Sequence, residues 1–81
     1  MDIKQIRNLF VKGTRIIVYS YQNRDNRIEM NDYLYDSGMG QTSVFGIRAI
    51  SENEVLLCID MPEAILDAWK NYANSITIED E

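Results

Sequence analysis

The sequence predicts a single α+β domain spanning residues 1–81. It combines an N-terminal helix, a four-stranded and mainly antiparallel sheet arranged as a meander, and a C-terminal helix with a short acidic tail. Segments 14–21 and 43–50 are rich in β-branched and aromatic residues, and 54–59 is a short apolar run, so all three predict strands. Apolar residues at helical spacing near both ends of the chain predict the two helices. The length allows one domain with a modest core.

The first predicted helix covers residues 2–12 and precedes the strand at 14–21. Asp2 is a suitable N-cap, and Gly13 stands where a helix often ends in a left-handed residue. The apolar residues between them recur at helical spacing and predict one buried stripe: Ile3, Ile6, Leu9 and Phe10.

Residues 27–36 fit two different predictions. As a helix, the segment would begin with a capping box formed by Asn26 and Glu29. As a strand, it would form a hairpin with the preceding strand across a polar turn at 22–26. The adjacent strand and two tyrosines within the segment favour the strand. A flexible connection with an exposed Met39 is expected to follow.

The predicted hairpin separates two faces of the sheet. Tyr19 would pair with Glu29 on a face that carries Tyr, Arg and Glu side chains. Val18 would pair with Met30 on a mostly apolar face, which is expected to be core.

A second hairpin is predicted over residues 43–59, with its turn at 51–54. Pairing Ile50 with Val55 leaves both faces of this hairpin largely apolar, so both need to be covered. If the helices lie on the same side, a second subunit must cover the other face. A homodimer through this hairpin is therefore one open alternative.

The last predicted helix begins at residues 60–61, with Pro62 in its first turn. We expect residues 74–75 to end it, a short strand to follow at 76–78, and the three acidic residues that close the chain to be solvated. Its apolar stripe is expected to comprise Ile65, Leu66, Trp69, Tyr72, Ala73 and Ile76.

The net charge of −5 is unevenly distributed along the chain. Six basic and two acidic residues lie up to Arg27, whereas two basic and eleven acidic residues follow from Ile28 onward. The acidic part would repel phosphate backbones, so we expect no direct nucleic-acid binding. A protein partner with a basic surface is favoured instead.

The residue types argue against catalysis and metal binding. Histidine is absent, which removes the commonest general base and the commonest metal ligand. Cys58 is the only cysteine and stands in an apolar run, so we expect it to be structural and inert. The sequence therefore predicts no catalytic residue, metal or cofactor, with an enzyme that uses tyrosines and carboxylates as the weaker alternative. One cysteine and the lack of a long apolar segment predict a cytoplasmic protein that does not enter membranes.

The remaining prediction is a small protein-binding module. Tyrosine and arginine dominate interface hot spots, so Tyr19, Tyr21 and Tyr33 are the predicted anchors. The same residues can also form a plain solvated sheet face, and that alternative stays open. The predicted acidic contacts with the partner are Glu52, Glu54, Glu63 and Asp67.

Small acidic inhibitors of phages and mobile elements, such as anti-CRISPR or anti-restriction proteins, share this size and charge. By that class-level analogy, the chain would inhibit or modulate a partner by covering its basic, nucleic-acid-binding surface. The alternative is a homo-oligomeric structural or accessory subunit without catalytic activity. Binding of single-stranded nucleic acid is a weaker alternative, because basic residues are few.

Overall fold

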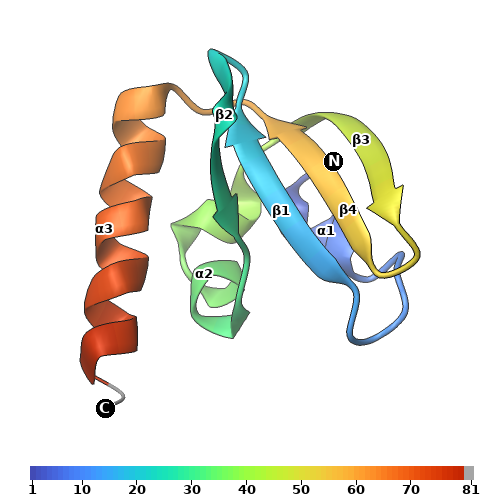
Figure 1. Ribbon diagram of the computed structural model, residues 1–81, viewed down its shortest axis with the longest axis horizontal. Coiled ribbons are helices and arrows are strands. Elements are labelled where there is room, and N and C mark those ends of the chain that lie inside the picture. Colours follow the sequence, from blue (N-terminus) through green and yellow to red (C-terminus); the bar gives the residue numbers. More distant parts are fainter. Residues whose placement is uncertain (80–81) are drawn as a thin grey trace.

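The computed structural model describes residues 1–79, with side chains described up to Ser75. It confirms the α+β class (Figure 1). In chain order, the elements are α1 (Ile3–Arg7), β1 (Arg15–Ser20), β2 (Asn23–Glu29), α2 (Asp32–Asp36), the 3-10 helix η1 (Gly38–Gln41), β3 (Val44–Ser51), β4 (Glu54–Ile59) and α3 (Glu63–Glu79). No helix in this described part is long and apolar enough to cross a membrane.

The four strands form a mixed sheet with the order β2-β1-β4-β3, so the predicted meander is wrong. Strands β1 and β4 are parallel, whereas β2 pairs with β1 and β3 pairs with β4 in antiparallel fashion. The physical reason lies in how apolar or polar the residues of each strand are. The apolar sequences of β1 and β4 occupy the sheet centre, where neighbours cover them, and the polar sequence of β2 takes an edge.

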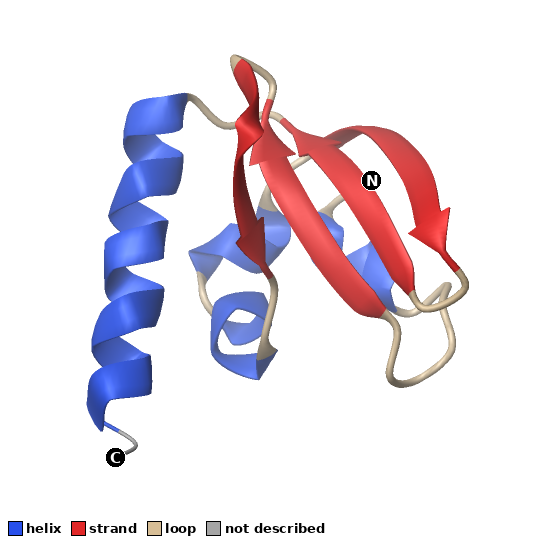
Figure 2. Ribbon diagram, in the orientation of Figure 1, coloured by secondary structure: helices blue, strands red, loops and turns tan. Residues whose placement is uncertain are grey.

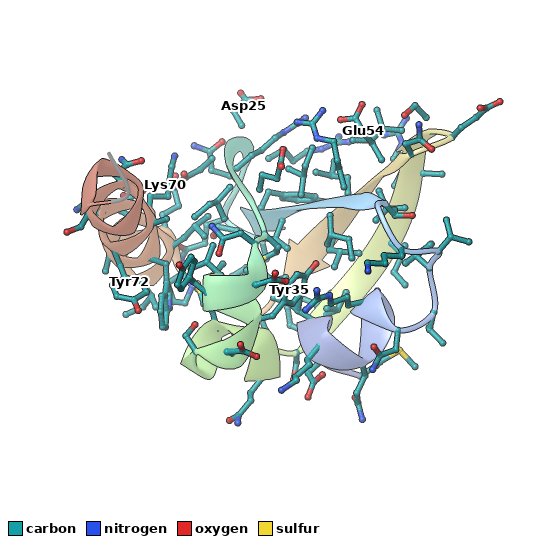
Figure 3. The ribbon with its side chains drawn as sticks, turned by 90° about the horizontal axis from the view of Figure 1, so that it is seen from below. Asp25, Tyr35, Glu54, Lys70 and Tyr72 are labelled. Atoms are coloured by element: carbon teal, nitrogen blue, oxygen red, sulfur yellow. The ribbon has the colours of Figure 1, made fainter. Side chains whose placement is uncertain are left out.

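The helices are distributed unequally around the sheet. Helices α1 and α2 lie on one face of the sheet, and α3 runs alongside the β2 edge (Figure 2). The main core lies between the sheet and these helices, where Val18, Leu34, Leu57 and Leu66 are fully buried. The opposite face, which we call the open face, is covered by no helix of the described chain (Figure 3).

Helix α1 is shorter than the predicted helix over 2–12. Asp2 is its N-cap, as predicted, and forms a capping box with Gln5. The helix ends at Arg7 with Asn8 as its C-cap, and the chain then turns back so that the Arg15 N–H donates to the Asn53 carbonyl oxygen at an N···O distance of 2.6 Å. Leu9 is 65% exposed as a result and is not part of a buried stripe.

Residues 27–36 divide between two elements, so the predicted strand is wrong beyond Glu29. Asn31 caps a new helix by accepting a 2.9 Å hydrogen bond from the Leu34 N–H. The predicted turn at 22–26 is also wrong, because these residues mostly belong to β2. Met39 is fully buried in η1, and the predicted exposed tip is therefore wrong as well.

The registers of both hairpins differ from the predicted ones. In the first hairpin, Tyr19 pairs with Arg27 instead of Glu29, a shift of two residues that leaves the paired residues 17–19 and 27–29 on their predicted faces, and an irregularity follows between Tyr19 and Ser20. In the second hairpin, an irregularity between Ala49 and Ser51 shifts the pairing by one residue, so Val55 faces Ala49.

Helix α3 begins at Glu63 and is helical through Glu79. The predicted break at 74–75 and the strand at 76–78 are therefore wrong. Leu66 is fully buried and Trp69 and Ala73 pack against the core. Two further members of the predicted stripe are about half exposed, namely Ile65 and Tyr72. The side chain of Ile76 and the acidic residues 80–81 lie outside the described residues.

Tyr35, in the layer of helices, makes the stability of the fold depend on pH in the alkaline range. The ring is buried below the sheet, and the guanidinium carbon of Arg7 lies 4.2 Å from its centroid. Desolvation raises the pKa of Tyr35 to about 12, although Arg7 lowers it in part. Between pH 10 and 12 the unfolded chain loses this proton first, so the stability falls as the pH rises, by at most about 2 to 3 kcal/mol.

Tyr35→Phe is expected to remove this part of the alkaline loss, measured by urea unfolding at several pH values. Tyr33→Phe is the matched control, because Tyr33 is an exposed residue of the same helix. Its alkaline slope should equal that of the unmodified chain. Equal slopes for both variants would refute the assignment to Tyr35.

Candidate binding surface

The two edges of the sheet differ in their accessibility. At the β2 edge, the Asn26 side chain donates to Asp67 at 3.0 Å and accepts a 2.8 Å hydrogen bond from Lys70. Asn23 donates to Glu63 at 2.9 Å. These contacts hold α3 alongside β2 (Figure 1) and block that edge.

The β3 edge is open beyond its first residue, because at its start the Val44 N–H donates to the Met1 carbonyl at 2.9 Å and Asp2 forms an isolated bridge with Ser43. All eight of its residues except Val44 are exposed, and no described strand pairs with its outer side. It presents apolar side chains, with Phe45 63% and Ile47 51% exposed. Irregularities between Val44 and Gly46 and between Ala49 and Ser51 leave 46–49 as its regular stretch. An exposed apolar edge of this kind is a template for another strand.

One end of the open face is occupied by an ion-pair network. Arg15 donates to Glu29 through Nε at 3.0 Å and through a second nitrogen, and its other terminal nitrogen lies 3.3 Å from Glu54. The hydrogen bond with Glu29 is the main reason that the pKa of Arg15 is raised, and the charges of Glu29 and Glu54 add to it. The charges at this end are therefore satisfied within the chain.

The other part of the open face carries three arginines around one hollow of about 230 Å³. Arg24 and Arg27 come from β2, and Arg48 comes from β3 at the opposite side of the sheet. The apolar side chain of Leu56 lines the hollow between them. We call this feature the arginine hollow.

Tyr19 lies half-buried on the same face, on β1, which stands between β2 and β4 in the sheet. Its pKa is raised mainly by a side-chain hydrogen bond with Cys58 and by desolvation, whereas the charges of Arg24 and Arg27 lower it. Cys58 is also partly exposed on this face, and is less enclosed than its apolar run predicts.

The three predicted tyrosine anchors do not form one group. Tyr19 lies on the open face, and Tyr21 lies in the turn after β1, where its ring meets Phe45 edge to face at a centroid distance of 6.2 Å. Tyr33 is exposed on α2, on the side of the helices. The structure thus brings Tyr19 and Tyr21 near the sheet surface and separates Tyr33 from them.

Three of the four predicted acidic contacts have partners within the chain. Glu54 pairs with Arg15, Glu63 accepts hydrogen bonds from Asn23 and Asn26, and Asp67 accepts one from Asn26. Glu52 is exposed in the turn between β3 and β4. Figure 3 places Glu54 and α3 at opposite ends of the molecule.

The acidic charge is not concentrated on the folded surface. Up to Ser75 the chain has eight basic and ten acidic residues, so the last three acidic residues supply more than half of the net charge. Among the side chains that the structure describes, no group of three or more acidic or cysteine residues is arranged to hold a metal ion.

Sequence reasoning missed Arg48, and it predicted an interface on a face of the 43–59 hairpin instead of along the outer edge of β3. The available signal was one charge in an otherwise apolar strand, on the face opposite to Ile47. Comparison with known protein families, curated proteins and solved structures gives no match to this chain.

Proposed function

We propose that this chain is a protein-binding module that receives an extended segment of a partner protein as an additional strand along the outer edge of β3. The observation that carries the proposal is the asymmetry of the sheet: α3 blocks the β2 edge, and the β3 edge is open beyond Val44, whose N–H is bonded to Met1. Strand addition satisfies the free backbone groups of such an edge, and side chains on alternate positions supply specificity.

The side chains of β3 suit this role. Phe45, Ile47 and Ile50 are all about half exposed or more, and their burial under an added strand contributes favourable free energy. Phe45 is already oriented by its contact with Tyr21, so less conformational freedom is lost on binding.

Charge favours an acidic partner segment over a second copy of this chain. Antiparallel pairing of two β3 edges turns the same faces of both sheets in one direction. It would place two sets of Arg24, Arg27 and Arg48 on one continuous face, where like charges repel. A partner strand with carboxylates at alternate positions would instead face Arg48 favourably.

The partner with a basic surface, predicted from the total charge, stays a prediction. It is supported by the net charge of −5 and by the exposure of Glu52. The inhibitor role inferred by analogy with anti-CRISPR and anti-restriction proteins also stays a prediction.

Ile47→Lys is expected to weaken strand addition strongly, because it places a long charged side chain on the docking edge. The probes are short peptides in which valine alternates with glutamate, and a second set in which it alternates with lysine. The glutamate peptides should bind and slow amide exchange in β3, and Ile47→Lys should weaken that binding about tenfold or more.

Ile65→Lys is the matched control, since Ile65 is 49% exposed on α3 against 51% for Ile47. It should bind the glutamate peptides as the unmodified chain does. Preference for the lysine peptides would contradict the acidic partner. A salt-insensitive dimer in sedimentation that Ile47→Lys dissociates would support the homo-oligomeric alternative instead.

A further inference from the structure

The arginine hollow collects cations from distant parts of the chain. Arg24 and Arg27 are separated from Arg48 by more than twenty residues and by the two central strands of the sheet. Their side chains nevertheless line one hollow, together with Leu56. Leu56 is buried although it lies on the open face, which is consistent with cover by the aliphatic parts of the arginines.

These three arginines differ from the other two in the chain. Arg7 pairs with Asp32 at 2.6 Å, and Arg15 pairs with Glu29 and Glu54. Within the part of the chain that carries described side chains, no carboxylate forms an ion pair with Arg24, Arg27 or Arg48. Three neighbouring cations without a counter-charge repel one another, and an anionic ligand relieves that repulsion.

Part of the site is already oriented. Arg27 donates from Nε to the backbone carbonyl of Arg24 at 2.9 Å, which fixes the plane of its guanidinium and leaves the two terminal nitrogens for another acceptor. The positive charges of Arg24 and Arg27 also act on the Tyr19 phenol, where they oppose the rise in its pKa. A planar guanidinium with two free nitrogens is suited to bidentate recognition of an oxyanion.

We infer that the arginine hollow binds a phosphate group that carries two negative charges. A single carboxylate would leave two of the three positive charges unbalanced, whereas a dianionic phosphate leaves one and offers three acceptor oxygens to the three forks. The hollow shares Arg48 and Ile50 with β3 but lies on the open face of the sheet, so a phosphate site there goes beyond the proposed strand addition and is tested separately from it.

The test is titration of the full chain with inorganic phosphate, O-phosphoserine and adenosine monophosphate at constant ionic strength, followed by calorimetry and by amide chemical shifts. We expect saturable binding of one phosphate group per chain, with shifts centred on β2 and β3. Arg27→Gln and Arg48→Gln should each weaken binding about fivefold to tenfold. Arg27→Lys should lie between, since it keeps the charge and loses the fork.

The pH dependence gives an independent readout. The groups that face or border the hollow are Arg24, Arg27, Arg48 and Tyr19, with Cys58 and the network of Arg15, Glu29 and Glu54 beside them. None of these groups is a histidine, because the chain has none. O-phosphoserine, whose second pKa is about 6, should therefore bind more tightly as the pH rises through that value.

Arg15→Gln is the matched control, because Arg15 lies on the same face and is ion-paired. It should bind phosphate as the unmodified chain does, and thermal melting verifies that each variant folds. Equal affinity for all three ligands would show that the phosphate group alone is recognised. Tighter binding of O-phosphoserine or of adenosine monophosphate would show whether the natural ligand is a phosphorylated protein or a nucleotide. Absence of saturation, or an equal loss in Arg15→Gln, would overturn the inference, whereas a failure of Ile47→Lys to affect peptide binding would leave it intact.

Discussion

Leu57→Ala is expected to lower the free energy of unfolding by about 2 to 5 kcal/mol, a large part of the stability of a domain this small. Leu57 is 0% exposed on the central strand β4, where it lies beside Val18 of β1 and opposite Ile47 of β3. Shortening the side chain leaves a cavity between the sheet and the helices, which the flanking strands cannot fill without losing their register. Urea unfolding followed by circular dichroism measures the change.

Leu9→Ala is the control for this prediction, because it removes the same atoms from a side chain that is 65% exposed. Its free energy of unfolding should stay within about 0.5 kcal/mol of that of the unmodified chain. If both variants unfolded at the same urea concentration, the central position of β4 would be wrong.

The strands were predictable where a short apolar or β-branched run identifies them locally. The bounds of β4 agree with the predicted strand at 54–59, and β1 lies within 14–21. Their parallel pairing was not predictable in this way, because it depends on contacts between residues about forty positions apart. The apolar character of both strands favours the sheet centre, but no local pattern states which strand each will meet there.

The short helices were mispredicted because they offer too little periodicity. Helix α2 has five residues, fewer than two turns, so one apolar stripe cannot be distinguished from strand alternation. The usable signal was its cap, since Asn31 precedes Asp32 at the start of the helix. The same shortness explains why α1 was extended too far from its correctly placed N-cap, Asp2.

The binding surface was predictable in part. Tyr19 and Arg27 occupy the predicted face, because a two-residue register shift preserves alternation. Arg48 reaches the same hollow only because the crossover through α2 and η1 places β3 at the far edge of the sheet. The acidic contacts on α3 were predicted from charge alone, and charge does not reveal that Glu63 and Asp67 accept hydrogen bonds from β2.

Gly40→Ala is expected to destabilise the domain by roughly 3 kcal/mol, because the site has no room for a methyl group. A Cβ atom at Gly40 would lie 2.3 Å from the carbonyl oxygen of Tyr35 and 3.1 Å from its carbonyl carbon. These are backbone atoms, so no rotamer change removes the overlap, and η1 must move away from α2. That movement would also loosen Met39, which is fully buried beside it.

Gly46→Ala separates this steric effect from the general effect of replacing a glycine. A Cβ at Gly46 meets no heavy atom within 4 Å, and the backbone there does not need positive φ. That variant should therefore be neutral or more stable by up to about 1 kcal/mol, since alanine restricts the unfolded chain. Urea unfolding of the two variants should thus give changes in the free energy of unfolding that differ in sign or clearly differ in size. Equal changes in the free energy of unfolding for the two variants would mean that η1 can move away from Tyr35 at little cost, although a Cβ at Gly40 would lie 2.3 Å from its carbonyl oxygen. The crossover would then not hold β3 at its edge by close packing.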